Sequence, residues 1–189
     1  MEDPEKEIMN ATYEALCKHG YAELSIKKIA EESSNSKSNI YYHFDDKKEL
    51  VLAFLEHMGN HIEKEHEALR ECKPEKRLDS LLEMALGVED DDQWAFRKAF
   101  LEMRAQAPQN PEFAEKFREI DDMIMKDIKN MLDQKGVKDP EMLAEILFSC
   151  IEGSLMRKVS TMDRKGLLEQ KNNIKRIVDR NIVDGCEDQ

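Results

Sequence analysis

Apolar side chains recur at three- and four-residue spacing along most of this chain, and that spacing predicts α-helices. No Val-, Ile- or Thr-rich alternating run predicts a strand, and only 7 glycines and 5 prolines interrupt the 189 residues. The pattern therefore predicts an all-α fold of about nine helices. The longer apolar stripes cover residues 50–69, 78–86, 94–103, 113–131, 143–155 and 167–178.

Two short helices joined by a polar turn are predicted near the N-terminus. Ser25 precedes a short apolar stripe, where its side-chain oxygen can accept a backbone N–H of a helix over residues 26–32. Residues 33–35 favour a turn, and Ser36 can cap a second helix over residues 37–43. A helix, a short turn and a second helix form the helix-turn-helix unit, whose second helix enters the major groove of DNA.

The second of these helices carries the side chains best suited to contact DNA. Tyr41, Tyr42 and His43 lie among small polar residues, and lysines on both sides can meet phosphate groups. Two alternatives stay open, because the tyrosines can instead pack on the first helix of the chain and Lys47 can be an ordinary solvated lysine. The candidate DNA-contacting residues are Ser25, Lys27, Lys28, Ser36, Lys37, Ser38, Asn39, Tyr41, Tyr42, His43 and Lys47.

Residues 5–54 resemble the DNA-binding domain of the TetR/AcrR family of transcriptional repressors. An amphipathic helix ends near Gly20, a serine-capped helix contains Ile29-Ala30, and the second short helix closes with Tyr41-Tyr42-His43-Phe44 and then a lysine. The turn at residues 33–36 is more polar than the family's usual Ala-Gly-Val-Ser. In this respect the recognition helix resembles that of the multidrug-responsive, QacR-type members.

The resemblance implies how the N-terminal helices meet DNA. It places Tyr41 and Tyr42 toward the duplex, and Ile40 and Phe44 toward the interior. It also implies a homodimer whose two recognition helices reach successive major grooves of a palindromic operator, about 34–36 Å apart. A ligand bound by the C-terminal domain would change that separation.

The helix predicted over residues 140–158 is apolar along two lines. Such a helix either lies deep in a core or is shared between a core and a partner chain. In the resembling family the last two helices of each subunit form a four-helix dimer interface, and Gly153 would allow a close backbone approach there. The residues expected at the interface are Leu143, Leu147, Ile151, Leu155, Ile174 and Val178.

Aromatic and methionine side chains concentrate between residues 94 and 148. Most such residues fill a core, but they also make adaptable ligand pockets. Glu102 lies in a largely apolar stretch, where it can meet a cationic ligand or reach solvent. The candidate lining residues for a small hydrophobic effector are Trp94, Phe96, Phe100, Met103, Phe113, Phe117, Met123 and Phe148.

Composition narrows the possible functions. The net charge of -12 counts against a nucleic-acid coat protein, but it allows a sequence-specific binder with local lysines. The 4 cysteines have no CxxC spacing and are expected to be free thiols in a reducing cytosol. His57 and His61 share a helix face without a third ligand nearby in the sequence, so we expect no metal site.

The sequence contains no motif typical of an enzyme, a secreted protein or a membrane protein. There is no Gly-rich phosphate loop and no nucleophile elbow, so we expect neither an enzyme nor a cofactor. The N-terminus is acidic, unlike that of a signal peptide, and no apolar run reaches the ~18 residues that span a membrane. We therefore expect a cytoplasmic protein with no membrane partner.

Together these features predict two domains, a helix-turn-helix DNA-binding domain in residues 1–50 and a helical effector-binding and dimerisation domain in residues 51–189. The predicted function is that of a homodimeric repressor, released from double-stranded operator DNA by a small hydrophobic ligand. The alternative is a helical protein-interaction module whose Tyr-Tyr segment binds protein instead of DNA.

Overall fold

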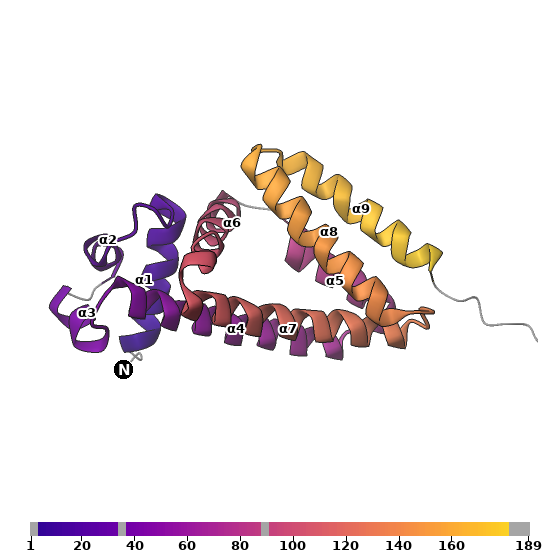
Figure 1. The fold of residues 1–189 in the computed structure, drawn as a ribbon, viewed down its shortest axis with the longest axis horizontal. Coiled ribbons are helices and arrows are strands. Elements are labelled where there is room, and N and C mark those ends of the chain that lie inside the picture. Colours follow the sequence, from indigo (N-terminus) through magenta and orange to yellow (C-terminus); the bar gives the residue numbers. More distant parts are fainter. Residues whose placement is uncertain (1–3, 34–36, 88–90, 182–189) are drawn as a thin grey trace, which may run out of the picture. The chain divides into compact units, whose positions relative to one another are not determined.

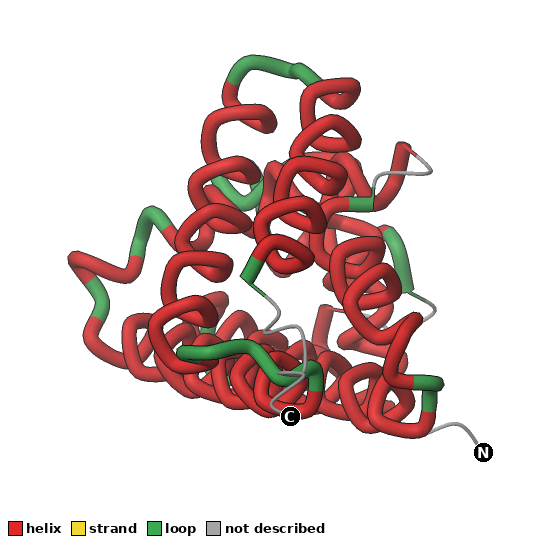
Figure 2. The backbone as a smooth tube through the Cα atoms, turned by 90° about the vertical axis from the view of Figure 1, so that its right-hand side faces the viewer, coloured by secondary structure: helices red, strands yellow, loops and turns green. Residues whose placement is uncertain are grey.

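The computed structural model describes residues 4–33, 37–87 and 91–181. Within these ranges every regular element is a helix, as the apolar spacing predicted (Figure 2). The chain forms two compact units. Unit 1 contains Met1–His61 and Glu89–Ile120, and unit 2 contains Ile62–Val88 and Asp121–Gln189.

Unit 1 combines the N-terminal helices with segments from the middle of the chain. Its elements are α1 (Pro4–His19), α2 (Ile26–Glu31), α3 (Lys37–His43), the first part of α4 (Lys47–Glu71), α6 (Asp91–Arg104), a 3₁₀ turn (Ala107–Gln109) and the first part of α7 (Pro111–Gln134) (Figure 1). These bounds lie close to the ranges that the stripes and caps predicted.

The core of unit 1 is shared between the helix-turn-helix segment and the later helices. Ile8 and Leu16 of α1 and Leu50 of α4 are fully buried in the same cluster as Met103 of α6 and Phe113 of α7. The compact unit therefore does not end near residue 50. A functional division at that residue remains a prediction, while the packing places the DNA-binding helices and α6 in one body.

Local capping sets the ends of the short helices. The Ser25 side chain accepts a hydrogen bond from the N–H of Lys28 at 3.3 Å and so begins α2. Asp46 begins α4 by accepting the N–H of Glu49 at 2.9 Å, and the Glu49 carboxylate accepts the N–H of Asp45 at 2.6 Å. Asp46 and Glu49 thus form a capping box, closed one residue earlier than its usual form.

Unit 2 consists of the rest of α4 and α7 with three further helices. These are α5 (Pro74–Leu86), α8 (Pro140–Ser160) and α9 (Arg164–Arg180). Helices α8 and α9 lie side by side, and α5 packs against both (Figure 1). Asp139 begins α8 by accepting the N–H of Met142 at 3.1 Å, ahead of Pro140 at the first helical position.

A buried polar contact joins α4 to α7 within unit 2. The Nδ1 atom of His66 lies 2.9 Å from Oδ2 of Asp127, and Nη2 of Arg70 donates to Oδ1 of the same carboxylate at 2.5 Å. His66 and Asp127 are buried, so this pairing satisfies polar groups that would be costly to leave alone. The contact fixes the register of the two helices.

Candidate nucleic-acid interface

Helix α3 is held by two inward anchors. Ile40 is fully buried and Phe44, directly after the helix, is buried as well. Both belong to the core of unit 1, together with Ile26 and Ile29 of α2. The inward orientation expected for Ile40 and Phe44 is therefore confirmed, and the opposite face of α3 is turned away from the core.

That outer face presents two tyrosines to solvent. Tyr41 is 54% exposed and Tyr42 is 84% exposed. The alternative in which both pack on a neighbouring helix is excluded by these exposures in the single chain. Tyr42 also touches His43 edge-on, with ring centroids 5.3 Å apart, and His43 is half-buried with its Nδ1 3.6 Å from the Glu5 carboxylate. The tyrosines are therefore free to enter a groove while His43 is drawn toward α1.

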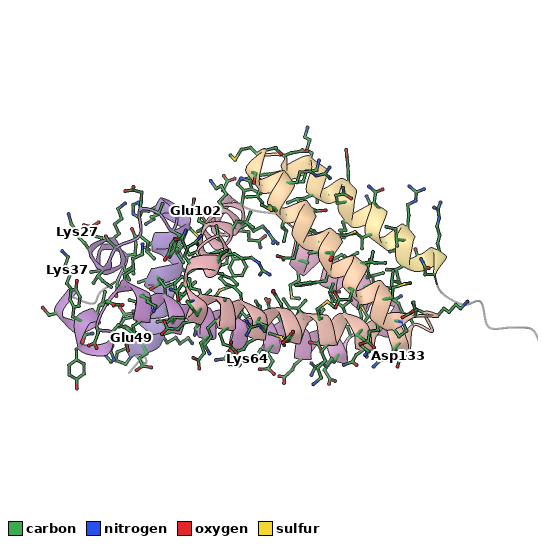
Figure 3. The ribbon with its side chains drawn as sticks, viewed as in Figure 1. Lys27, Lys37, Glu49, Lys64, Glu102 and Asp133 are labelled. Atoms are coloured by element: carbon green, nitrogen blue, oxygen red, sulfur yellow. The ribbon has the colours of Figure 1, made fainter. Side chains whose placement is uncertain are left out.

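Some of the basic and small polar residues predicted to contact DNA are exposed, and others pair with side chains or backbone groups of the same unit. Lys37 and Ser38 of α3 are exposed, and Asn39 is half-buried. Lys27 is 68% exposed and lies 3.6 Å from Glu31, while Lys28 lies 3.3 Å from Glu23. Lys27 of α2 and Lys37 of α3 lie at the same end of unit 1 (Figure 3). Ser25 uses its hydroxyl as the cap of α2, and Ser36 lies outside the described residues.

Lys47, a candidate phosphate contact, makes two contacts inside unit 1. Its Nζ donates to the backbone carbonyl of Tyr21 at 3.0 Å and lies 4.3 Å from the centroid of the Tyr21 ring. Burial lowers the pKa of Lys47, and the nearby Glu23 carboxylate opposes this change. Lys47 is therefore not an ordinary solvated lysine, and its contact with phosphate remains a prediction.

The six residues expected at a dimer interface are mostly buried within the single chain. Five of them are buried inside unit 2 of the single chain, and Leu155 is half-buried. A side chain that the single chain already buries is not available to a second chain, so these five residues do not form the interface, whereas Leu155 keeps part of its surface exposed. The five buried residues are Leu143, Leu147, Ile151, Ile174 and Val178.

The predicted effector residues are not gathered in one unit. Six of them belong to unit 1, where Trp94, Met103, Phe113 and Phe117 are buried and Phe96 and Phe100 are half-buried. Tyr13 stacks on Phe96 with centroids 4.7 Å apart, and Phe100 meets Phe117 edge-on at 5.4 Å. Met123 and Phe148 belong to unit 2 and are half-buried. The aromatic concentration in α6 and α7 thus serves largely as the core around the DNA-binding helices.

Unit 2 contains a small cavity of about 90 Å³ beside the buried His66–Asp127 contact. Drug-sized ligands occupy pockets of roughly 300–1,000 Å³. Arg70 and Arg77, which line the cavity, already donate to Asp127 and to backbone carbonyls at the end of α4. This cavity is therefore too small for a drug-sized hydrophobic effector.

The described residues also bear on metal and membrane binding. Among them, no three His, Cys, Asp or Glu side chains gather as a group that could hold a metal ion. None of the described helices is both long enough and apolar enough to cross a bilayer.

Comparison with known proteins places this arrangement in a family. Residues 8–54 match the model of the bacterial regulatory proteins of the tetR family. A TetR transcription regulator from Haloarcula marismortui, known from its crystal structure, is 31% identical, with a TM-score of 0.85 over 96% of this chain and 99% of that chain. The chain belongs to the TetR family of transcriptional regulators. This confirms the predicted family and fold class, and it confirms that this TetR-family chain is a DNA-binding regulator and not an enzyme.

This TetR-family chain is also similar to other regulators. The HTH-type transcriptional repressor AcnR of Corynebacterium efficiens is 23% identical over 172 residues, covering 87% of this chain and 86% of that protein. An HTH-type regulator of Lactococcus lactis is 36% identical over 62 residues, which are 33% of this chain and only 30% of that protein. A regulator from Saccharomonospora viridis, solved in complex with choline, is 22% identical with a TM-score of 0.80 over 96% of this chain and 98% of that chain.

Proposed function

We propose that this regulator is a homodimeric repressor whose α3 helices bind successive major grooves of a palindromic operator. The observation that carries the proposal is the pair of exposed tyrosines, Tyr41 and Tyr42, on a short helix whose other face is anchored by Ile40 and Phe44. A fixed helix that presents aromatic rings and hydroxyls can contact base edges as well as phosphates. We propose that a regulator acting on DNA in this way works in the cytoplasm.

Replacement of the two tyrosines tests the interface. We expect Tyr41→Ala and Tyr42→Ala to weaken operator binding by ~1–3 kcal/mol for each base interaction that the truncation removes. Fluorescence anisotropy with a palindromic fragment from beside the gene measures the effect. Unfolding should stay unchanged, because both side chains are exposed. Tyr→Phe variants at the same positions separate the hydroxyls from the rings, and full operator affinity in the double alanine variant would refute the assignment.

The polar turn and the resemblance to multidrug-responsive members bear on the ligand. AcnR is named a repressor, and the regulator of Saccharomonospora viridis was solved in complex with choline. We propose a small-molecule effector of this chain that is hydrophobic and either cationic or neutral, in keeping with the net charge of -12. Half-buried Phe96 and Phe100 in unit 1 are one pair of candidates to contact it, and Met123 and Phe148 in unit 2 are a separate pair.

A thermal-shift screen tests the effector proposal. Quaternary ammonium compounds, neutral hydrophobes and acyl anions are compared, and a true effector should stabilise the fold by ~2.7 kcal/mol at a hundredfold excess over Kd. The same compound should lower operator affinity, because coupling between two binding sites is reciprocal. A set of stabilising compounds that leaves operator binding unchanged, or that contains only small polar metabolites, would contradict the proposal.

Dimerisation is proposed through the outer face of α8, which the single chain leaves uncovered. Met142 is 54% exposed, Ile146 is 44% exposed and Met156 is 66% exposed. Ser149 and Gly153 lie on the same face at helical spacing, and a Cβ built on Gly153 would meet nothing within 4 Å. Apolar side chains that flank small residues suit close packing against a second copy of the helix. This face replaces the buried one that the sequence suggested.

A further inference from the structure

Glu102 of α6 contacts the turn that follows α1. Its Oε2 accepts the backbone N–H of Tyr21 at 2.7 Å and that of Ala22 at 3.2 Å. Figure 3 labels Glu102 on α6, and the two residues it contacts are about eighty positions earlier in the sequence. Glu102 as a whole is exposed, but its carboxylate is already bound to two backbone N–H groups. It is therefore neither an unoccupied site for a cationic ligand nor a side chain that only contacts solvent.

The same turn is held from α4 and α7. Lys47 of α4 donates to the carbonyl of Tyr21, which also accepts the N–H of Leu24 at 3.2 Å. The Tyr21 ring meets Phe113 of α7 edge-on, with centroids 6.3 Å apart. Burial raises the pKa of the Tyr21 hydroxyl. Side chains from three helices, α4, α6 and α7, thus contact Tyr21 of the turn. Among these three side chains, Glu102 supplies the negative charge, which lies against backbone N–H groups.

Gly20 makes the close approach of the carboxylate possible. Its φ of +71° lies in the left-handed region, and a Cβ at this position would stand 3.0 Å from Oε2 of Glu102. The turn is short, because α1 ends at His19 and α2 begins at Ile26. The direction of the chain at residues 20–22 therefore determines where α2, and α3 after it, can lie.

We propose that Glu102 is a positioning residue for DNA binding, which fixes the α1–α2 turn and so the orientation of α2 and α3 toward the operator. This rests on the proposed function. A carboxylate that accepts two N–H groups makes charge-assisted hydrogen bonds, which are stronger than those of a neutral acceptor. Glutamine at this position keeps an acceptor oxygen without the charge, whereas alanine keeps neither.

The experiment compares Glu102→Ala and Glu102→Gln with Glu115→Gln. Glu115 is a matched control, because it is an exposed acid of unit 1 whose carboxylate pairs with Arg118 on its own helix at 2.5 Å. Amide hydrogen exchange of Tyr21 and Ala22 is followed by NMR on the full chain, and binding to operator and to non-specific DNA is followed by anisotropy.

We expect Glu102→Ala to speed exchange at Tyr21 and Ala22 and to weaken operator binding about tenfold, with non-specific binding and thermal stability nearly unchanged. Glu102→Gln should restore part of both, and Glu115→Gln should match the wild type. If the alanine variant does not fold, faster exchange and weaker operator binding in Glu102→Gln alone support the proposal.

Two outcomes overturn it. Wild-type exchange at both amides in the folded Glu102→Ala variant shows that the carboxylate does not hold the turn. Faster exchange with wild-type operator affinity shows that the turn does not orient α2 and α3. A wild-type chain that binds no operator is a different result, since it defeats the proposed function, and the exchange measurement still reports on the turn without DNA.

Discussion

Ile146→Glu combined with Met156→Glu should convert the protein into a folded monomer that binds a palindromic operator about a hundredfold more weakly. Both side chains are exposed in the single chain, so the substitutions do not disturb its core. In a dimer they would bury charges without partners, which is costly. A monomer reaches only one half-site, so it forgoes the gain from bivalent binding, roughly 10²–10⁴-fold. Sedimentation velocity and operator anisotropy measure the two effects.

The control for this prediction places the same charges on another helix. Asn60→Glu with Ala68→Glu adds two acids at exposed positions of α4 and should leave a dimer with full operator affinity. A wild-type monomer at micromolar concentration would remove the proposed interface, and so would a dimeric Ile146→Glu, Met156→Glu variant.

Phe113→Ala should lower the free energy of unfolding by ~3–5 kcal/mol, the usual cost of truncating a buried phenylalanine. Phe113 is 1% exposed, belongs to the same core cluster as α1 and α4, and meets the ring of Tyr21. Operator binding should fall with stability, although the residue does not lie on α3. Urea unfolding, followed by circular dichroism and by the fluorescence of buried Trp94, measures the change.

Phe148→Ala serves as its comparison. Phe148 is half-buried in unit 2, so its truncation should cost clearly less and leave the DNA-binding unit intact. A loss of under about 1 kcal/mol in Phe113→Ala would show that this ring is not a core residue. It would then be a candidate ligand contact, as the concentration of aromatics in the sequence suggested.

Local features of the fold were predictable from the sequence because they depend on neighbouring residues. The cap at Ser25, the box at Asp46 and Glu49, and the start of α8 at Asp139 each use a side chain within four residues of its backbone partner. The inward orientation of Ile40 agreed with the family pattern. The helix ends and the buried side of α3 could therefore be predicted without knowledge of any tertiary contact.

Features that depend on distant partners were not predictable in the same way. Lys47 contacts the carbonyl of Tyr21, and Glu102 contacts two N–H groups far along the chain. The residues that neighbour Lys47 or Glu102 in the sequence do not indicate which distant residue each side chain contacts. Spacing also shows which positions of α8 are apolar but not what covers them. Leu143, Leu147 and Ile151 proved to be covered by the chain itself, while the face with Met142 and Ile146 was left uncovered.

The mixed origin of the unit 1 core limits how this DNA-binding segment can be exchanged between proteins. A chimera that joins residues 1–50 to the remainder of another regulator would separate Ile8 and Leu16 from Met103 and Phe113, which complete their core. Recombination that transfers operator specificity must therefore carry α6 and the start of α7 as well, or must find a recipient with matching side chains there. Specificity in this chain can evolve more easily by substitution on the outer face of α3 than by exchange of whole segments.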